Sequence, residues 1–175
     1  PAEYTRVDDI VEMVFITSKD KDPLDPGPVS KPEPGPIDSD ETIPAKRASI
    51  VKAFGESQNV DFIRKKLASY SDSNDDIRIV VSVSKRYQSP DLPYWYGFID
   101  SQKTYLEGAT NGYFILGCTD SPNFFAIPIA EMNEFAREMR SSSRGSEGSI
   151  GYKSWKHVQL NINEAGYRLR LPSSN

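Results

Sequence analysis

Alternating apolar and polar residues predict a set of β-strands in the middle of the chain. Between residues 77 and 84 the pattern has period two, which is typical of a strand with one buried face. Three apolar runs predict further strands at residues 94–99, 113–118 and 124–128. A short polar segment that favours a turn separates the last two, so we expect an antiparallel meander.

The first 45 residues divide into a short apolar segment and a proline-rich one. In residues 1–17 helical spacing of the apolar positions predicts a helix, and a strand over residues 13–17 is the alternative. Residues 18–45 are rich in proline and aspartate. This composition neither continues a helix nor pairs as a strand, so we expect a linker or a long surface loop.

Residues 46–175 are expected to form one α+β domain. Apolar spacing predicts a helix over residues 45–54 that Gly55 ends, and a second helix that begins at Asn59. Residues 129–139 predict another helix with one apolar side. The expected fold is therefore an antiparallel sheet of about five strands packed against two or three helices.

A predicted C-terminal hairpin carries the residue types most informative about function. Residues 154–161 and 167–171 are expected to pair around a turn, with apolar residues on one face. The other face would carry Trp155, His157, Gln159, Asn161, Arg168 and Arg170. Such side chains stack on bases, read base edges and hold phosphates, which predicts a nucleic-acid interface. A solvated sheet face, or one covered by a helix, would show the same alternation.

Three further cations are candidate phosphate contacts at the periphery of this interface. Lys65 and Lys66 belong to a basic run in the helix expected after Asn59. Arg144 lies in a Ser- and Gly-rich segment, residues 141–151, that is expected to be a loop.

Trp95 is a further candidate, because it lies in the densest aromatic cluster of the sequence. A base could stack within this cluster, and a glycine in a strand often marks the close approach of a ligand. The alternative is that Tyr94, Tyr96 and Phe98 form the core while Trp95 packs under a loop.

Two acids and a lysine suggest a different activity. Asp91, Asp100 and Lys103 superficially resemble the motif of restriction-type nucleases, whose carboxylates hold one or two divalent ions. The spacing of Asp100 and Lys103 would place them on opposite faces of a strand, and both would serve equally well as turn residues. Mg²⁺ is expected only with this activity; without it, the sequence predicts no cofactor and no metal site.

Net charge and composition do little to decide between nucleic-acid binding and nuclease activity. The net charge is −4, but residues 1–45 hold four Lys or Arg and eleven Asp or Glu, against seventeen and fourteen in the rest. The predicted domain is therefore mildly basic, which is compatible with a nucleic-acid partner. No apolar run could cross a bilayer, and the one cysteine, Cys118, lies in an apolar run where it is expected to be buried. We expect a soluble, cytoplasmic protein without membrane contact.

Several aromatic motifs together resemble a known group of proteins. These are residues 94–98, 112–118, 125–129 and 155–158, within a region from about 78 to 171. The pattern resembles bacterial proteins linked to restriction and modification, which implies a DNA-recognition or accessory domain of a defence system. DNA binding is thus the leading hypothesis. A metal-dependent endonuclease, and a protein-interaction domain whose acidic, proline-rich linker binds a partner, are the alternatives.

Overall fold

The computed structural model describes residues 42–87 and 94–137 in full. It also describes the backbone of residues 4–7, 11–15, 138, 141–144, 153–163 and 166–170. These segments form two sheets and three helices, so the α+β class is confirmed.

The larger sheet, which we call sheet A, is mixed and not antiparallel throughout. Its strand order is β1-β2-β8-β7-β5-β4-β3, and the pairs β5–β7 and β2–β8 are parallel. The expected meander holds only for β7 and β8, because the chain leaves sheet A after β5 and returns beside it. The strands are β1 (Tyr4–Val7), β2 (Val11–Phe15), β3 (Ile63–Arg64), β4 (Ser69–Ser71), β5 (Ile77–Ser84), β7 (Asn111–Cys118) and β8 (Phe124–Pro128).

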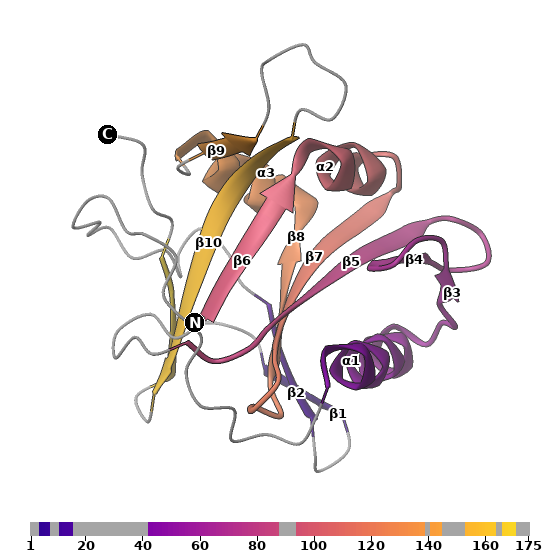
Figure 1. Ribbon diagram of the computed structural model, residues 1–175. Helices are drawn as coiled ribbons and strands as arrows, with labels where there is room; N and C mark the ends of the chain where they lie inside the picture. Colours follow the sequence, from indigo (N-terminus) through magenta and orange to yellow (C-terminus); the bar gives the residue numbers. More distant parts are fainter. Residues whose placement is uncertain are drawn as a thin grey trace.

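The smaller sheet, sheet B, contains the predicted C-terminal hairpin. Its strands are β6 (Tyr94–Ile99), β9 (Ser141–Arg144), β10 (Lys153–Asn163) and β11 (Gly166–Arg170). β10 pairs antiparallel with each of the other three strands. Sheet B lies in front of sheet A in Figure 1, with β10 on the left and β3 and β4 at the far right.

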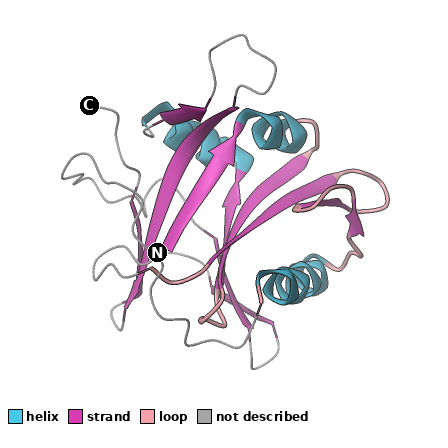
Figure 2. Ribbon diagram, viewed as in Figure 1, coloured by secondary structure: helices cyan, strands magenta, loops and turns pink. Residues whose placement is uncertain are grey.

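The three helices lie on both sides of sheet A. Helix α1 (Ile43–Gln58) packs against β5 and β7 on one face, whereas α2 (Asp100–Glu107) and α3 (Ile129–Glu138) cover the other face together with β6. Figure 2 shows α1 separated from the other two helices by the strands of sheet A. None of the helices in the described part of the chain has the length and apolar character needed to cross a membrane.

Two apolar clusters hold these layers together, because the strands of sheet A are apolar on both faces. One joins α1 to sheet A through Ile50, Phe54, Ile79, Val81 and Ile115, among others. The other joins sheet A to β6, α2 and α3 through Phe114, Leu116, Tyr96, Leu106 and Phe135, among others. A strand buried on both sides needs a nearly continuous apolar run, which is what residues 113–118 provide.

The helix predicted for residues 1–17 is wrong. The described residues in this region form an antiparallel pair in which Tyr4 faces Val14 and Arg6 faces Glu12. Strand β2 also pairs with β8, so this hairpin extends sheet A. Aromatic and β-branched residues favour strands when a partner strand is available, and that partner lies more than 100 residues away in the sequence. The alternative strand over residues 13–17 overlaps β2, and residues 16–41 lie outside the described part.

The second predicted helix after Asn59 is also wrong. Helix α1 runs through Gly55 and ends at Asn59, which adopts a left-handed conformation with φ of 55°. The chain then continues in an extended conformation into β3, with Ile63 and Leu67 exposed. The apolar spacing resembled that of a helix, but neither Ile63 nor Leu67 is buried, so neither provides the packing that stabilises a helix in a protein.

Candidate nucleic-acid interface

Strand register brings the candidate residues of the C-terminal hairpin onto one face of sheet B. In β10 and β11, Gln159 is opposite Arg170 and Asn161 is opposite Arg168. On the other edge of β10, Gln159 is also opposite Trp95 of β6. Residues directly opposite each other in antiparallel strands share a face, and every second residue along a strand shares it too. This set therefore includes Trp155, His157, Gln159, Asn161, Arg168, Arg170 and Trp95.

We call this the outer face of sheet B, because the alternate residues of β6 belong to the core. In β6 the residues Tyr94, Tyr96 and Phe98 are each only 2% exposed, whereas the intervening Trp95 and Gly97 are partly exposed. The expectation that the three alternate aromatic residues form core is thus confirmed. Trp95 occupies the outer-face register, and its backbone amide donates a hydrogen bond to the Ser84 hydroxyl at 3.1 Å.

Arg144 belongs to the same face, although it was expected in a loop. Residues 141–144 form β9, in which Arg144 is opposite Lys153 and Ser142 is opposite Trp155. Lys153 was missed as a candidate. The signal that could have found it is the alternation of β10 itself, since Lys153 is two residues before Trp155.

The outer-face positions carry basic residues and no acidic ones. Four of them are basic, namely Arg144, Lys153, Arg168 and Arg170. The remaining ones are aromatic, amide, hydroxyl, imidazole, glycine or aliphatic residues: Trp95, Gly97, Ile99, Ser142, Trp155, His157, Gln159, Asn161, Asn163 and Gly166. The eleven residues of β10 extend over about 35 Å, close to one turn of a DNA duplex.

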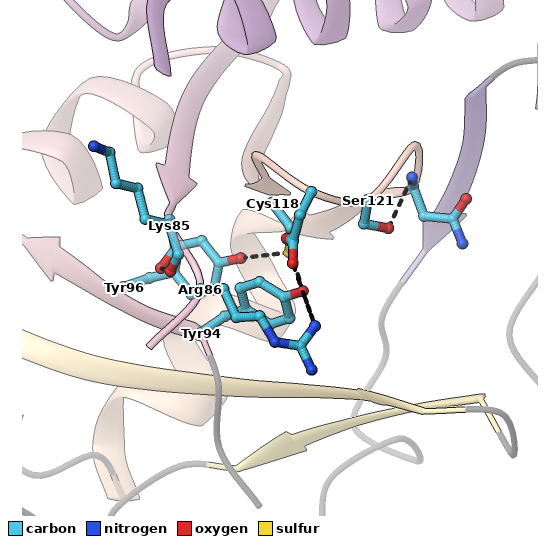
Figure 3. Close-up of polar contacts among 9 residues, drawn as sticks. Lys85, Arg86, Tyr94, Tyr96, Cys118 and Ser121 are labelled. Carbon is cyan, nitrogen blue, oxygen red and sulfur yellow. Dashed lines mark hydrogen bonds and ion pairs between the residues drawn. The ribbon is translucent and has the colours of Figure 1, made fainter. Parts of the chain in front are cut away.

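Buried tyrosines on β6 hold this sheet against sheet A. The Tyr96 hydroxyl donates a hydrogen bond to the Gly117 carbonyl oxygen at 3.0 Å and lies 3.2 Å from the Cys118 sulfur. The Tyr94 hydroxyl donates to Asp120 at 2.8 Å, directly after β7. Figure 3 shows both tyrosines reaching toward the end of β7. These bonds fix the position of β6, and with it the edge of sheet B that carries Trp95.

The Asp120 carboxylate beside these tyrosines forms an ion pair with the Arg86 guanidinium. Arg86 lies beside Tyr94, as seen in Figure 3, and donates to Asp120 at 3.2 Å. This hydrogen bond raises the pKa of Arg86, while burial raises the pKa of Tyr94. Burial also raises the pKa of the Cys118 thiol to about 12, so the thiol is neutral and Cys118 is a buried structural residue, as expected.

Lys65 and Lys66 lie far from the outer face. They occupy the turn between β3 and β4 at the opposite edge of sheet A, on the far side of the molecule from β10 in Figure 1. Both are exposed. The structure therefore does not bring them together with the C-terminal candidates.

The acidic residues of the nuclease hypothesis have a different setting from the one expected. Asp100 and Lys103 lie three residues apart on α2, not on a strand or a turn. Both line a hollow of about 330 Å³, where the Lys103 amine is 3.8 Å from Glu107, which accepts a hydrogen bond from Asn133. Asp91 lies outside the described residues. Within residues 42–87 and 94–137, no three His, Cys, Asp or Glu residues are grouped so that they could hold a metal ion.

Comparison of the chain with protein families, characterised proteins and solved structures gives no match. The resemblance to restriction and modification proteins therefore gains no support from these comparisons.

Proposed function

We propose that this chain binds nucleic acid, most favourably DNA, through the outer face of sheet B. The observation that supports the proposal is the backbone register, which groups four basic residues with two tryptophans and no acid on one sheet face. The rest of the chain carries a net negative charge, so this grouping is local and does not follow from composition.

The chemistry of these positions suits a nucleic acid better than other anions. Guanidinium and amine groups bind phosphates, indole rings stack on bases, and amide side chains recognise base edges. A small anion would need only one or two of the cations. The length of β10 provides contacts along about one turn of duplex or a similar length of single strand. Membership of a restriction or defence system is a further part of this proposal and rests on the sequence resemblance.

The proposal is tested by fluorescence anisotropy with a labelled DNA duplex of about 20 base pairs and a single strand of about 20 nucleotides, without metal. We expect binding that weakens with salt, with a slope of log K against log salt approaching about −3.6 for duplex if all four cations contact phosphates. The variant Arg168→Gln/Arg170→Gln should reduce the steepness of this slope by about 1.8 and weaken binding at low salt.

A matched variant separates this interface from a general effect of charge. Lys65→Gln/Lys66→Gln removes the same amount of charge from the other side of the molecule and should leave the salt slope unchanged. Thermal unfolding of both variants checks that each remains folded. Equal loss of affinity in the two variants, or no binding by the wild type at low salt, would refute an interface on the outer face.

A further inference from the structure

A second surface lies between α1 and the chain that follows it. Here a hollow of about 870 Å³ opens to solvent, within the size range of ligand-binding sites. Val51 of α1 and Phe62 and Tyr70 of the opposite wall are partly buried against the core beneath. The hollow thus has an apolar floor that packs on the core between α1 and sheet A.

The end of α1 shapes this hollow. Asn59 reverses the chain in a left-handed conformation, and the Val60 amide donates to the Gly55 carbonyl oxygen at 2.9 Å. A Cβ atom at Gly55 would lie 2.7 Å from the Val60 carbonyl oxygen, so only glycine permits this close return. The extended segment that follows therefore runs alongside the helix and leaves a space between them.

Strand β3 forms one wall and is an edge strand. It pairs with β4 only, and no strand of the described residues pairs with its other edge. Both of its residues, Ile63 and Arg64, are exposed. An unpaired strand edge offers backbone donors and acceptors to an extended peptide.

One apolar side chain on this wall, Leu67, is exposed without any contribution to the core. Leu67 is 70% exposed, and the only other large apolar residue in the fully described ranges that is so accessible is Ile63 of β3, which does not line the hollow. The Arg64 guanidinium donates to the carbonyl oxygens of Lys66 and Leu67 and so holds this turn in place. An exposed leucine on a fixed turn, beside a hollow with an apolar floor, is typical of a protein-binding surface.

The charge around the hollow is mainly positive. Arg47, Lys52 and Arg64 line it, and Lys65 and Lys66 lie on the adjoining turn. The acids that line it are Glu56 and Asp61. Glu56 pairs with Lys52 at 3.6 Å, and the remaining cations on the lining and the adjoining turn outnumber Asp61, so an acidic partner would complement the charge.

We propose that this hollow, which we call the α1–β3 groove, binds an extended acidic peptide segment of a partner protein. The peptide adds a strand to the free edge of β3, places aliphatic side chains against Leu67 and the apolar floor, and pairs its carboxylates with the surrounding cations. An unpaired strand edge and an exposed leucine favour a peptide over a nucleic acid, because a nucleic acid is held through its phosphates and bases and makes no use of either feature. This site is separate from the outer face of sheet B.

The probe is a fluorescein-labelled nonapeptide of sequence Glu-Val-Asp-Ile-Glu-Val-Asp-Ile-Glu. We expect salt-sensitive binding that Leu67→Ser weakens by about tenfold or more, since burial of a leucine side chain contributes that much affinity. Lys65→Gln/Lys66→Gln should weaken binding of this peptide but not of a version with glutamine and asparagine in place of its acids. Arg168→Gln/Arg170→Gln should have no effect on either peptide.

Amide hydrogen exchange provides a readout that surface charge alone would not change. Addition of the peptide should slow exchange at the backbone amides of Phe62 and Arg64, because these alternate with the amides that face β4 and so lie on the free edge that strand addition pairs. Absence of binding at about 1 mM peptide, or binding without this protection, would overturn the proposal. DNA is added as a competitor of the probe. If the displacement requires Lys65 and Lys66 but not Leu67, the groove binds phosphates and the peptide proposal is overturned. If a peptide with the sequence of residues 30–41 binds more tightly than the nonapeptide probe, the groove is assigned to the chain's own acidic segment and not to a partner protein.

Discussion

Gly117 lies where helix α1 packs against sheet A through Ile50, and its replacement tests this packing directly. A Cβ atom at this position would lie 2.3 Å from the terminal methyl carbon, Cδ1, of Ile50. The next contacts are ordinary, at 3.5 Å from Val83 and 3.7 Å from Ile50 Cγ1. Only one methyl group, on a side chain that is 1% exposed, therefore stands in the way of alanine.

The magnitudes follow from this geometry. Gly117→Ala should lower the free energy of unfolding by about 1–3 kcal/mol, the usual cost of overpacking a core. Ile50→Val removes the obstructing methyl group and alone should cost about 0.5–1.5 kcal/mol. In the double variant the new Cβ occupies space that the methyl group has left, so the two costs should not add. We expect a favourable coupling of at least about 1 kcal/mol.

Urea unfolding at 25 °C, followed by tryptophan fluorescence, measures all four members of this cycle. The comparison requires equal m-values, so that the midpoints report stability. If the two costs add to within about 0.5 kcal/mol, the two residues do not share this space and the packing of α1 on β7 is not as described. The result also bears on sheet B, because the Gly117 carbonyl oxygen accepts the hydrogen bond from Tyr96 of β6.

Three further predictions concern hydrogen bonds and a buried proton. Tyr96→Phe removes the donor to Gly117 and should lower the free energy of unfolding by about 1–2 kcal/mol in urea; an unchanged midpoint would contradict this bond. Cys118 keeps its proton when folded up to a pKa of about 12, whereas the unfolded chain loses it near pH 9. Stability should therefore fall as pH rises between about 9 and 12, and fall less steeply in Cys118→Ala, as followed by urea unfolding at each pH. The Thr42 hydroxyl accepts from the Ala45 amide at 3.3 Å, so Thr42→Ala should cost about 1 kcal/mol and Thr42→Ser much less, measured by thermal unfolding.

Local pattern was sufficient wherever a segment was strongly alternating or strongly apolar. The strands at β5, β6, β7 and β8, and helix α3, lie close to the predicted ranges. Helix α2 was missed because Leu106 is its only buried residue. Its first turn is stabilised by a hydrogen bond from the Ile99 amide to the Gln102 side chain, a local signal too weak to stand out among polar residues.

The candidate interface was also predicted in part by local pattern and in part only by tertiary structure. Alternation along β10 and β11, together with a short turn, was enough to group Trp155, His157, Arg168 and Arg170, because register within a hairpin is set by neighbouring residues. Arg144 joined them only through the pairing of β9 with β10, and Lys65 was separated from them only by its place at the far edge of sheet A.

The sequence by itself determined the strands at β5, β6, β7 and β8, which residues of β6 are buried, and the shared face of the C-terminal hairpin. Only the tertiary structure decided that β5 and β7 are parallel neighbours, that residues 4–7 and 11–15 form strands, and that α1 and β3 enclose a groove. The reason is physical: a side chain's periodicity records how much of it is buried, but not which distant segment buries it. Pairing between segments far apart in the chain depends on the whole set of apolar surfaces that must be covered at once.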